Sequence, residues 1–305
     1  MEKILAVTGA TGKKSGGAFI EKLVANIDKV KSIYSGIRTL VRESSNTVLL
    51  EKLIPEVDVV RGNFDDKNYL NKALESVDTL VHIAGISFSP KLVDAAVKCQ
   101  VRRLILVHTT GIYSKYKAAG EEYRKIDTYV YEQCKMNNIK LTVLRPTMIY
   151  GNLSDKNVCK FIKMVDKFPI MPVVNGARYQ LQPVHYIDLA DAYFQVLMHE
   201  KETVGHDFNL SGGEPIYLRD MLQVIGKNLG KKVSFISVPF PIAYAGAVCV
   251  YGISFGKVDY REKVQRLCEP RIFSHKEAKE AFGYNPMSFE QGVKNEVKEY
   301  KRKKK

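Results

Sequence analysis

The chain has 305 residues, 45% of them hydrophobic and 26% charged, and its formal net charge at pH 7 is +14. This composition is typical of a compact globular protein and excludes a largely disordered chain. The five cysteines form no CxxC pair and have no zinc-ligand spacing, so we expect free thiols and no metal site. Met1 leads directly into an apolar segment without a basic leader, which predicts a cytoplasmic protein.

The first 150 residues alternate short β-branched runs with amphipathic stretches. This pattern predicts βαβ units around a parallel sheet. The first helix is expected at residues 18–30. The six strands are expected at residues 4–8, 37–42, 57–61, 78–84, 103–109 and 141–145. Six such strands are sufficient for a doubly wound sheet.

The segment TGATGKKSGG lies between the first predicted strand and the first predicted helix. Gly9 and Gly12, with Thr11 between them, would let the backbone approach a pyrophosphate held at the positive end of the helix. A third glycine at the usual spacing would fall on Ser15, which is small enough for close packing of helix against strand. The junction therefore predicts a dinucleotide site.

The end of the second predicted strand distinguishes NAD from NADP. An acidic residue there binds the free ribose hydroxyl of NAD, whereas arginine neutralises the 2′-phosphate of NADP. This chain has Arg38 and Arg42, and the nearest acid is Glu43. We therefore expect NADP, with NAD as the alternative; one of the two arginines could instead only solvate the strand end.

The next two strand ends complete the predicted cofactor site. Asn63 and Phe64 would lie beside the adenine, and Asp65 and Asp66 would cap the following helix at residues 67–74. At the end of the fourth strand, Ala84 and Gly85 would lie against the cofactor ribose, where small residues permit a close backbone approach.

After Gly151 the pattern changes. Helices are expected at residues 188–199 and 218–229, and strands near residues 207–210 and 233–238. We predict an α/β fold with three parts: a Rossmann-type doubly wound parallel sheet over residues 1–150, a smaller α+β substrate lobe over residues 151–293 interleaved with the last sheet strands, and a basic tail over residues 294–305.

An apolar stretch at residues 239–255 is shorter than the roughly 20 residues needed to span a bilayer. We interpret it as a packing helix or a dimer surface, and expect no stable membrane insertion. The final stretch, residues 294–305, holds seven basic and two acidic side chains. We interpret that run as a solvated tail and expect no nucleic-acid partner.

Taken together, the motifs resemble the extended or atypical short-chain dehydrogenase/reductase superfamily, the group of NAD-dependent epimerase/dehydratases with its NmrA-like and complex-I-subunit-like relatives. The motifs that carry this resemblance are TGATG at 8–12, VRGNFDD at 60–66, VDTLVHIAG at 77–85, LRPTMIYG at 144–151 and LQPVHYIDLADAY at 181–193. The resemblance extends over nearly the whole chain, and it implies a possible homodimer.

In catalytic members of this superfamily a Ser or Thr after the fifth strand acts with a Tyr-x-x-x-Lys pair. The lysine lowers the pKa of the tyrosine, which passes a proton while hydride moves to or from the nicotinamide. By resemblance, Thr109 or Thr110 would supply the hydroxyl, and Tyr113 with Lys117 the pair. The loop between Thr109 and Tyr113 is shorter than is usual in the superfamily.

Two other tyrosines compete with Tyr113. Tyr131 and Lys135 have the same spacing, but they lie too late in the predicted helix to reach the nicotinamide. Tyr123 lies at a better distance from the sixth strand, yet the residue four positions later is Asp127. That arrangement would mean a lost lysine and an unusual or inactive site.

The substrate lobe offers its own candidates. Tyr150 would line the substrate pocket, and Arg178, Arg266 and Arg271 could hold the diphosphate of a sugar nucleotide. We interpret His185 as a packed residue rather than a base. The leading hypothesis is an NAD(P)-dependent oxidoreductase or epimerase that acts on a carbonyl or hydroxyl of a nucleotide-linked sugar. The alternative is an NADP-binding sensor or assembly subunit without turnover.

Overall fold

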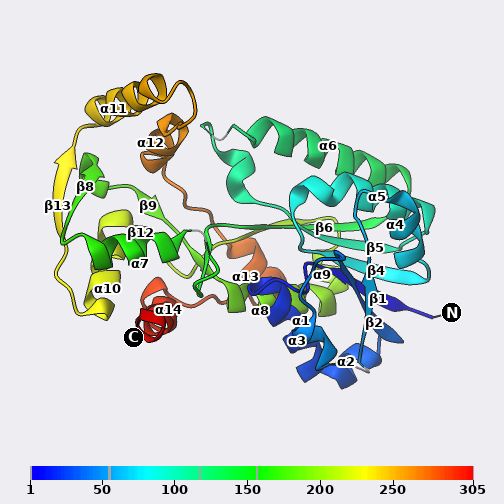
Figure 1. The fold of residues 1–305 in the computed structure, drawn as a ribbon. Helices are drawn as coiled ribbons and strands as arrows, with labels where there is room; N and C mark the ends of the chain where they lie inside the picture. The colour runs from blue at the N-terminus through cyan, green and yellow to red at the C-terminus, as the bar shows by residue number, and fades with distance from the viewer. Residues whose placement is uncertain (1, 54–55, 117, 156, 305) are drawn as a thin grey trace.

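A seven-stranded parallel sheet forms the centre of the molecule (Figure 1). The computed structural model describes residues 2–53, 56–116, 118–155 and 157–304. The strand order is β11-β6-β5-β4-β1-β2-β3. The strands are β1 Ile4–Thr8, β2 Gly36–Val41, β3 Val57–Arg61, β4 Val77–His82, β5 Arg103–Val107, β6 Lys140–Pro146 and β11 Asp207–Leu210. The predicted α/β class and the parallel, doubly wound sheet are confirmed.

Helices cover both faces of this sheet because its strands are apolar on both sides. One layer consists of α4 Lys67–Ala73, α5 Ser89–Lys98 and α6 Gly120–Met136. The other layer consists of α1 Ser15–Ala25, α2 Ile27–Lys31, α3 Val48–Glu51, α8 Tyr186–Met198, α9 Glu200–Thr203 and α13 Lys276–Phe282. The chain leaves β1 towards β2 on one side and returns to β4 on the other. In open sheets the carboxyl edge at such a reversal of strand order is where ligands bind.

The second lobe is built around a separate apolar core. Its strands are short and pair two by two: β7 Ile149–Tyr150 with β10 Val184–His185, β9 Gln180–Leu181 with β12 Ile216–Tyr217, and β8 Ile170–Val174 with β13 Ser234–Val238. Its helices are α7 Val158–Lys167, α10 Leu218–Leu229, α11 Phe240–Ile253, α12 Arg261–Leu267 and α14 Phe289–Lys304. Figure 1 places α11 at the outer end of this lobe, far from the sheet.

Three sequence-based expectations need correction. The first helix begins at Ser15 and is divided at Asn26 into α1 and α2. Residues 294–304 are not a solvated tail, since they continue α14, where Val297 is buried and the Tyr300 hydroxyl donates to Asp166. The apolar residues at 293, 297 and 300 lie on one helical face, which the abundance of lysine in this run obscured.

The third correction concerns the apolar stretch at residues 239–255. It does form a helix, α11, but Ala247 is its only buried residue. The helix therefore does not pack into the core of this chain, and the alternative expectation, a dimer surface, stays a prediction. Within the described residues, no helix combines the length and the apolar character needed to cross a bilayer.

Candidate cofactor and substrate site

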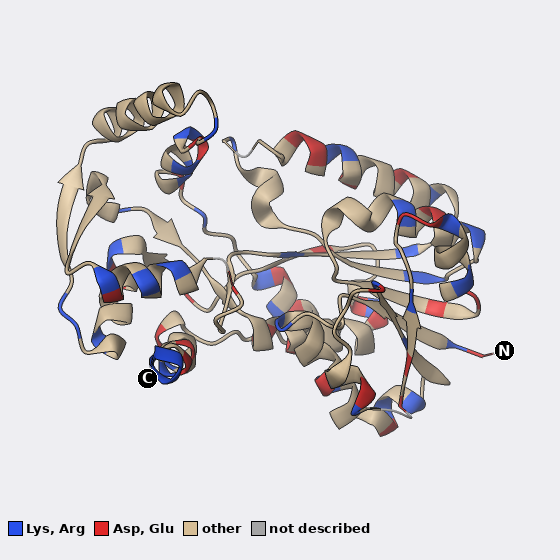
Figure 2. Ribbon diagram, viewed as in Figure 1, with Lys and Arg blue, Asp and Glu red and all other residues tan. Residues whose placement is uncertain are grey.

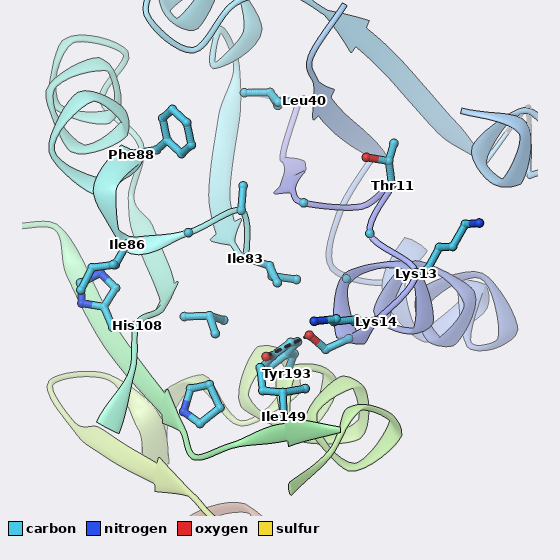
Figure 3. Close-up of a pocket in the computed structure, with 18 of the residues that line it drawn as sticks. Thr11, Lys13, Lys14, Leu40, Ile83, Ile86, Phe88, His108, Ile149 and Tyr193 are labelled. Carbon is cyan, nitrogen blue, oxygen red and sulfur yellow. Dashed lines mark hydrogen bonds between the residues drawn. The ribbon is translucent and has the colours of Figure 1, made fainter. Parts of the chain in front are cut away.

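The carboxyl edge of the sheet opens into a cavity of about 670 Å³, which we call the first cavity (Figure 3). This volume is typical of a cofactor site. Residues at the ends of β1, β2, β4 and β5 line it, together with the N-terminus of α1 and residues of α6 and α8. All of the predicted first-loop residues, Gly9, Thr11 and Gly12, are among them.

Backbone crowding explains the glycines of this loop. Gly9 has a φ of +78°, and a Cβ there would come within 3.0 Å of the Ala84 amide nitrogen at the end of β4. A Cβ at Gly16 would lie 2.1 Å from the carbonyl oxygen of Gly9. The third glycine of the fingerprint is therefore Gly16, one residue later than the Ser15 position. Ser15 instead receives a hydrogen bond of 3.4 Å from the Tyr193 hydroxyl.

The N-terminus of α1 has the properties of an anion site. No side chain caps it, and its first turn contains no acidic residue. Its first backbone amides are thus available to a ligand, and the helix dipole favours negative charge there. Lys13 and Lys14 line the first cavity directly before the helix (Figure 3). Sequence reasoning did not single out these lysines, although their place before the helix start was a usable signal.

The two arginines of β2 and its end have different environments. Arg42 lines the first cavity together with Ser45. Arg38 does not line it: its Nε donates to Asp58 at 3.1 Å, and its Nη1 donates to the carbonyl oxygens of Ala73 and Glu75. Arg38 therefore joins two strand ends and the end of α4, and its assignment to the cofactor was wrong. Arg38 is the third residue of β2 and lies towards the amino end of the strand, whereas the cavity lies at the carboxyl end.

At the end of β3, Phe64 lines the first cavity and packs edge-on against Phe88, with ring centroids 5.4 Å apart. Asn63 does not line the cavity; its side-chain oxygen accepts from the Asp65 amide instead, so the expected adenine contact is not present. Asp66 caps α4 as predicted, through the Asn68 amide. Asp65 pairs with Lys91 rather than capping a helix.

The turn after β4 brings Ala84 and Gly85 to the first cavity, as the sequence predicted. The buried His82 side chain holds this turn. Its Nδ1 lies 2.6 Å from Thr8 Oγ1, and its Nε2 lies 2.9 Å from the carbonyl oxygen of Gly85. Burial lowers the pKa of His82 to about 3, so the ring is neutral. A neutral ring with a proton on Nε2 accepts from Thr8 and donates to Gly85.

A second cavity of about 430 Å³ lies next to the first. Thr109, Lys14 and Ile149 line both cavities, which therefore meet at these three residues. The Thr109 Oγ1 accepts from the Gly111 amide at 3.0 Å, so its hydroxyl proton can be donated to a ligand. Of the predicted catalytic residues that the structure describes, Thr109 lines both cavities and Tyr113 only the second.

The competing tyrosines differ in which cavity they line. Tyr113, in the short helix η2 Thr110–Tyr113, lines the second cavity, where its ring packs on Phe273. Tyr123, in α6, lines the first cavity. Lys117 lies outside the described residues. Tyr131 donates to Asp207 at the far end of α6 and lines neither cavity, so the alternative pair with Lys135 is excluded from the site.

Asp127 occupies the position four residues after Tyr123, where a lysine would be expected. Its carboxylate accepts from His108 Nδ1 at 2.7 Å and pairs with Arg145 at 2.7 Å. Burial opposes its ionisation, but the hydrogen bond from His108 and the Arg145 guanidinium hold the pKa of Asp127 below its ordinary value. This buried charge pair joins β5, β6 and α6. The residue four positions after Tyr123 is thus a carboxylate engaged by His108 and Arg145.

Two arginines distinguish the second cavity. Arg266 and Arg271 both line it, and among the described residues the Nε atom of each is buried without a hydrogen-bond partner. Burial, followed by the nearby positive charge of Arg266, lowers the pKa of Arg271 to about 10. Two neighbouring cations with unsatisfied donors favour an anionic ligand, because unpaired buried donors are costly.

Two other predicted substrate residues are placed elsewhere. Tyr150 is buried between His185 and Phe289 and lines neither cavity. Its alternation along β7 turns it into the core of the second lobe, so the substrate assignment was wrong. Arg178 is exposed after the turn at residues 175–177 and also lines neither cavity. His185 is buried against the Tyr150 ring, consistent with a packed residue.

The sheet, the glycine-rich junction and the adjoining second lobe define an extended short-chain dehydrogenase/reductase fold. Residues 1–255 match the model of the NmrA-like family, and the chain belongs to that family. It is similar over 117 residues, at 24% identity, to subunit 9 of the NADH dehydrogenase (ubiquinone) 1 alpha subcomplex of Arabidopsis thaliana mitochondria. That alignment covers 38% of this chain and 29% of the subunit, so the chain matches less than a third of that relative's length.

Two longer similarities extend to the second lobe. The N-acetyl-alpha-D-glucosaminyl-diphospho-ditrans,octacis-undecaprenol 4-epimerase of Escherichia coli is 20% identical, with 64% of this chain and 67% of the epimerase covered. The structure of a dTDP-glucose 4,6-dehydratase from Streptomyces venezuelae with bound NAD superposes with a TM-score of 0.74 at 18% identity. It covers 98% of this chain and 97% of the dehydratase. At such identities the likeness establishes the fold, including the second lobe.

Proposed function

We propose that the protein is an NAD(P)-dependent oxidoreductase or epimerase acting on a carbonyl or hydroxyl group of a sugar diphosphate. A nucleotide-linked sugar is the first substrate class to test, and NADP is the proposed coenzyme. The observation that carries the proposal is the meeting of the two cavities at Thr109, Lys14 and Ile149. A coenzyme in the first cavity and a substrate in the second would come together there.

The fit to a dinucleotide rests on the first cavity. A side chain at Gly9 or Gly16 would clash with the backbone of the loop that borders this cavity. The uncapped N-terminus of α1, with Lys13 and Lys14, suits a pyrophosphate. Arg42 and Ser45 would hold a 2′-phosphate, which is the support for NADP over NAD.

The fit to a sugar diphosphate rests on Arg266 and Arg271 in the second cavity. Their guanidinium groups can bind phosphate oxygens in a bidentate manner. Thr109, Thr110 and Gln182 line the same space and offer hydrogen bonds for sugar hydroxyl groups. The names of the Escherichia coli epimerase and the Streptomyces venezuelae dehydratase each include a diphosphate-linked sugar, which agrees with this substrate class.

The chemistry assigned to the chain is proton donation and positioning. When bound, the coenzyme would supply or accept hydride. Burial raises the pKa of Tyr113, an effect that Arg145 partly opposes, so the phenol is protonated at neutral pH. Tyr113 is therefore suited to donate a proton to a substrate oxygen, while Thr109 orients that oxygen. This protonation state favours carbonyl reduction as the first reaction to assay.

Oxidation of NADPH should be followed with a panel of 4-keto nucleotide sugars and simple carbonyls. We expect Tyr113→Phe to lower kcat by about 100-fold or more with the Kd for NADPH unchanged. Tyr123→Phe is the matched comparison in the first cavity, and it should weaken NADPH binding instead. Arg271→Gln should raise KM for sugar diphosphates and leave simple carbonyls unaffected.

The second candidate function is an NADP-binding sensor or assembly subunit without turnover. It is favoured by the Asp127 side chain, which stands four residues after Tyr123 and pairs with His108 and Arg145. Tight NADPH binding together with no oxidation of NADPH by any member of the panel would reject the enzyme proposal and support the sensor. Turnover that is lost in Tyr113→Phe would reject the sensor.

A further inference from the structure

The helix α11 and the turn after it expose an apolar surface that nothing in the described residues covers. The exposed side chains are Ile242 at 63%, Val248 at 43%, Val250 at 39%, Ile253 at 79% and Phe255 at 92%. We call these five residues the α11 surface. Large apolar side chains exposed together mark an interaction site, whereas isolated ones do not.

The α11 surface extends around much of the helix. At 100° per residue, Ile242, Val248 and Val250 are spread over an arc of about 200°. A helix that packs on one flat partner needs an apolar stripe of only about 100°. The width of the exposed arc therefore favours a deformable apolar medium that can cover the whole arc over a second protein that covers one side of it.

Charged residues are absent from residues 233–256 and resume at both ends of this run (Figure 2). Lys231 and Lys232 precede the run and Lys257 follows it, and Lys232 and Lys257 are exposed. Lysines beside an apolar segment attract anionic headgroups and reach the interface with their long side chains. The 14 residues of α11 rise about 21 Å, too short for a bilayer core of about 30 Å.

The α11 surface is connected to the second cavity. The Arg261 guanidinium of α12 stacks 3.8 Å from the Tyr251 ring centroid of α11. Arg266, further along α12, lines the second cavity. A ligand that holds α11 would therefore also fix the position of the cavity wall that bears Arg266.

We propose that the α11 surface docks on an anionic lipid bilayer. The helix lies in the interface with its apolar arc among the acyl chains, and Lys232 and Lys257 contact the headgroups. The contact is peripheral and reversible, and it holds the second cavity next to the membrane. Docking is independent of turnover, so its test does not depend on the function proposed above.

Co-sedimentation with phosphatidylcholine vesicles containing phosphatidylglycerol tests the proposal on the full chain. We expect the wild-type protein to bind these vesicles and to bind pure phosphatidylcholine vesicles more weakly. The double variant Ile242→Asp, Ile253→Asp should lower the partition coefficient by about tenfold or more. The double variant Lys232→Glu, Lys257→Glu should bind less and lose most of the dependence on anionic lipid.

Met136→Asp is the matched control, because Met136 is 65% exposed at the end of α6, far from α11 in the chain. It should bind vesicles as the wild type does, and all variants should retain the wild-type melting temperature, which verifies their fold. A wild-type protein that stays in the supernatant overturns the proposal. A dimer that the isoleucine variants dissociate, with vesicle binding unaltered by them, also overturns it and assigns the α11 surface to a second copy of the chain.

Discussion

The two cavities differ in what builds them. The loop beside the first cavity is constrained by backbone contacts: a Cβ at Gly9 would meet the Ala84 backbone, a Cβ at Gly16 would meet the Gly9 carbonyl oxygen, and no side chain caps the start of α1. The second cavity is lined by residues from both halves of the chain, and Arg266 and Arg271 give it cationic side chains. Backbone recognition suits a ligand part that is common to many proteins, and side-chain recognition suits a ligand that differs between relatives.

The hydrogen bonding of buried polar side chains also differs between the two parts of the chain. In the first half of the chain, His82 and Asp127 are buried with hydrogen-bond partners that hold strands and helices together. In the second lobe the described residues include buried donors without partners, among them Arg266 Nε and Arg271 Nε. Arg103 Nε and Arg145 Nη1 in the first half are also buried without partners, but Arg266 and Arg271 both line the second cavity, where a ligand could satisfy their donors.

The largest predicted effect tests the backbone contacts beside the first cavity, and it comes from adding one methyl group to that loop. In Gly16→Ala the new Cβ would lie 2.1 Å from the Gly9 carbonyl oxygen, so the loop must move. We expect the affinity for NADPH, measured by calorimetry, to fall by about 100-fold or more. The control is Gly36→Ala, since a Cβ there meets nothing within 4 Å. Equal affinities in the two variants would contradict the claim that the close backbone approach at Gly16 is needed for coenzyme binding.

A smaller effect is expected at the adenosine end, where a side chain adds selectivity to the backbone site. Arg42→Gln should raise the Kd for NADPH by roughly 10-fold or more and change the Kd for NADH little, because only NADPH has a 2′-phosphate. Arg38→Gln is the matched control: it removes an ion pair to Asp58 and should lower the melting temperature without altering coenzyme preference. A change of preference in Arg38→Gln alone would reverse the assignment of the two arginines.

The last prediction concerns the pH dependence of stability in the second lobe, where the effect of one pH unit is no larger than a tenfold change in an equilibrium constant. Burial, together with the neighbouring Asp155, raises the pKa of Glu296 from 4.5 to about 10. The folded protein therefore holds a proton that the unfolded chain releases. The free energy of unfolding should fall as pH rises from 4.5 towards 10, by at most about 1.4 kcal/mol per pH unit.

Urea unfolding at several pH values measures this slope. Glu296→Gln should flatten it, because the amide keeps a donor for Asp155 and has no proton to lose. Glu299→Gln is the control: Lys303 helps to hold the pKa of Glu299 below its usual value although burial opposes this, so that variant should keep the slope. A wild-type slope in Glu296→Gln would mean that another group carries the proton.

The sequence by itself determined the parallel sheet and the first loop. β1, β3, β11 and α10 have the bounds that periodicity predicted. Gly9 and Gly12 lie where a strand passes into a helix, and both line the first cavity. These features could be predicted because hydrophobic period and local backbone geometry are properties of neighbouring residues. The same reasoning placed Ala84 and Gly85 directly after β4, where they line the first cavity.

Only the tertiary structure decided which side chains reach the cavities. Arg42 directly follows β2 and lines the first cavity, whereas Arg38 is the third residue of that strand and is hydrogen-bonded to Asp58 and to the end of α4. Tyr150 was assigned to the substrate and is instead buried in the core, whereas Lys13 and Lys14 were overlooked. The exposure of α11 was likewise invisible, because an apolar helix has the same sequence pattern whether or not another part of the chain covers it. Such outcomes depend on contacts between residues distant in the chain, which local sequence patterns do not encode.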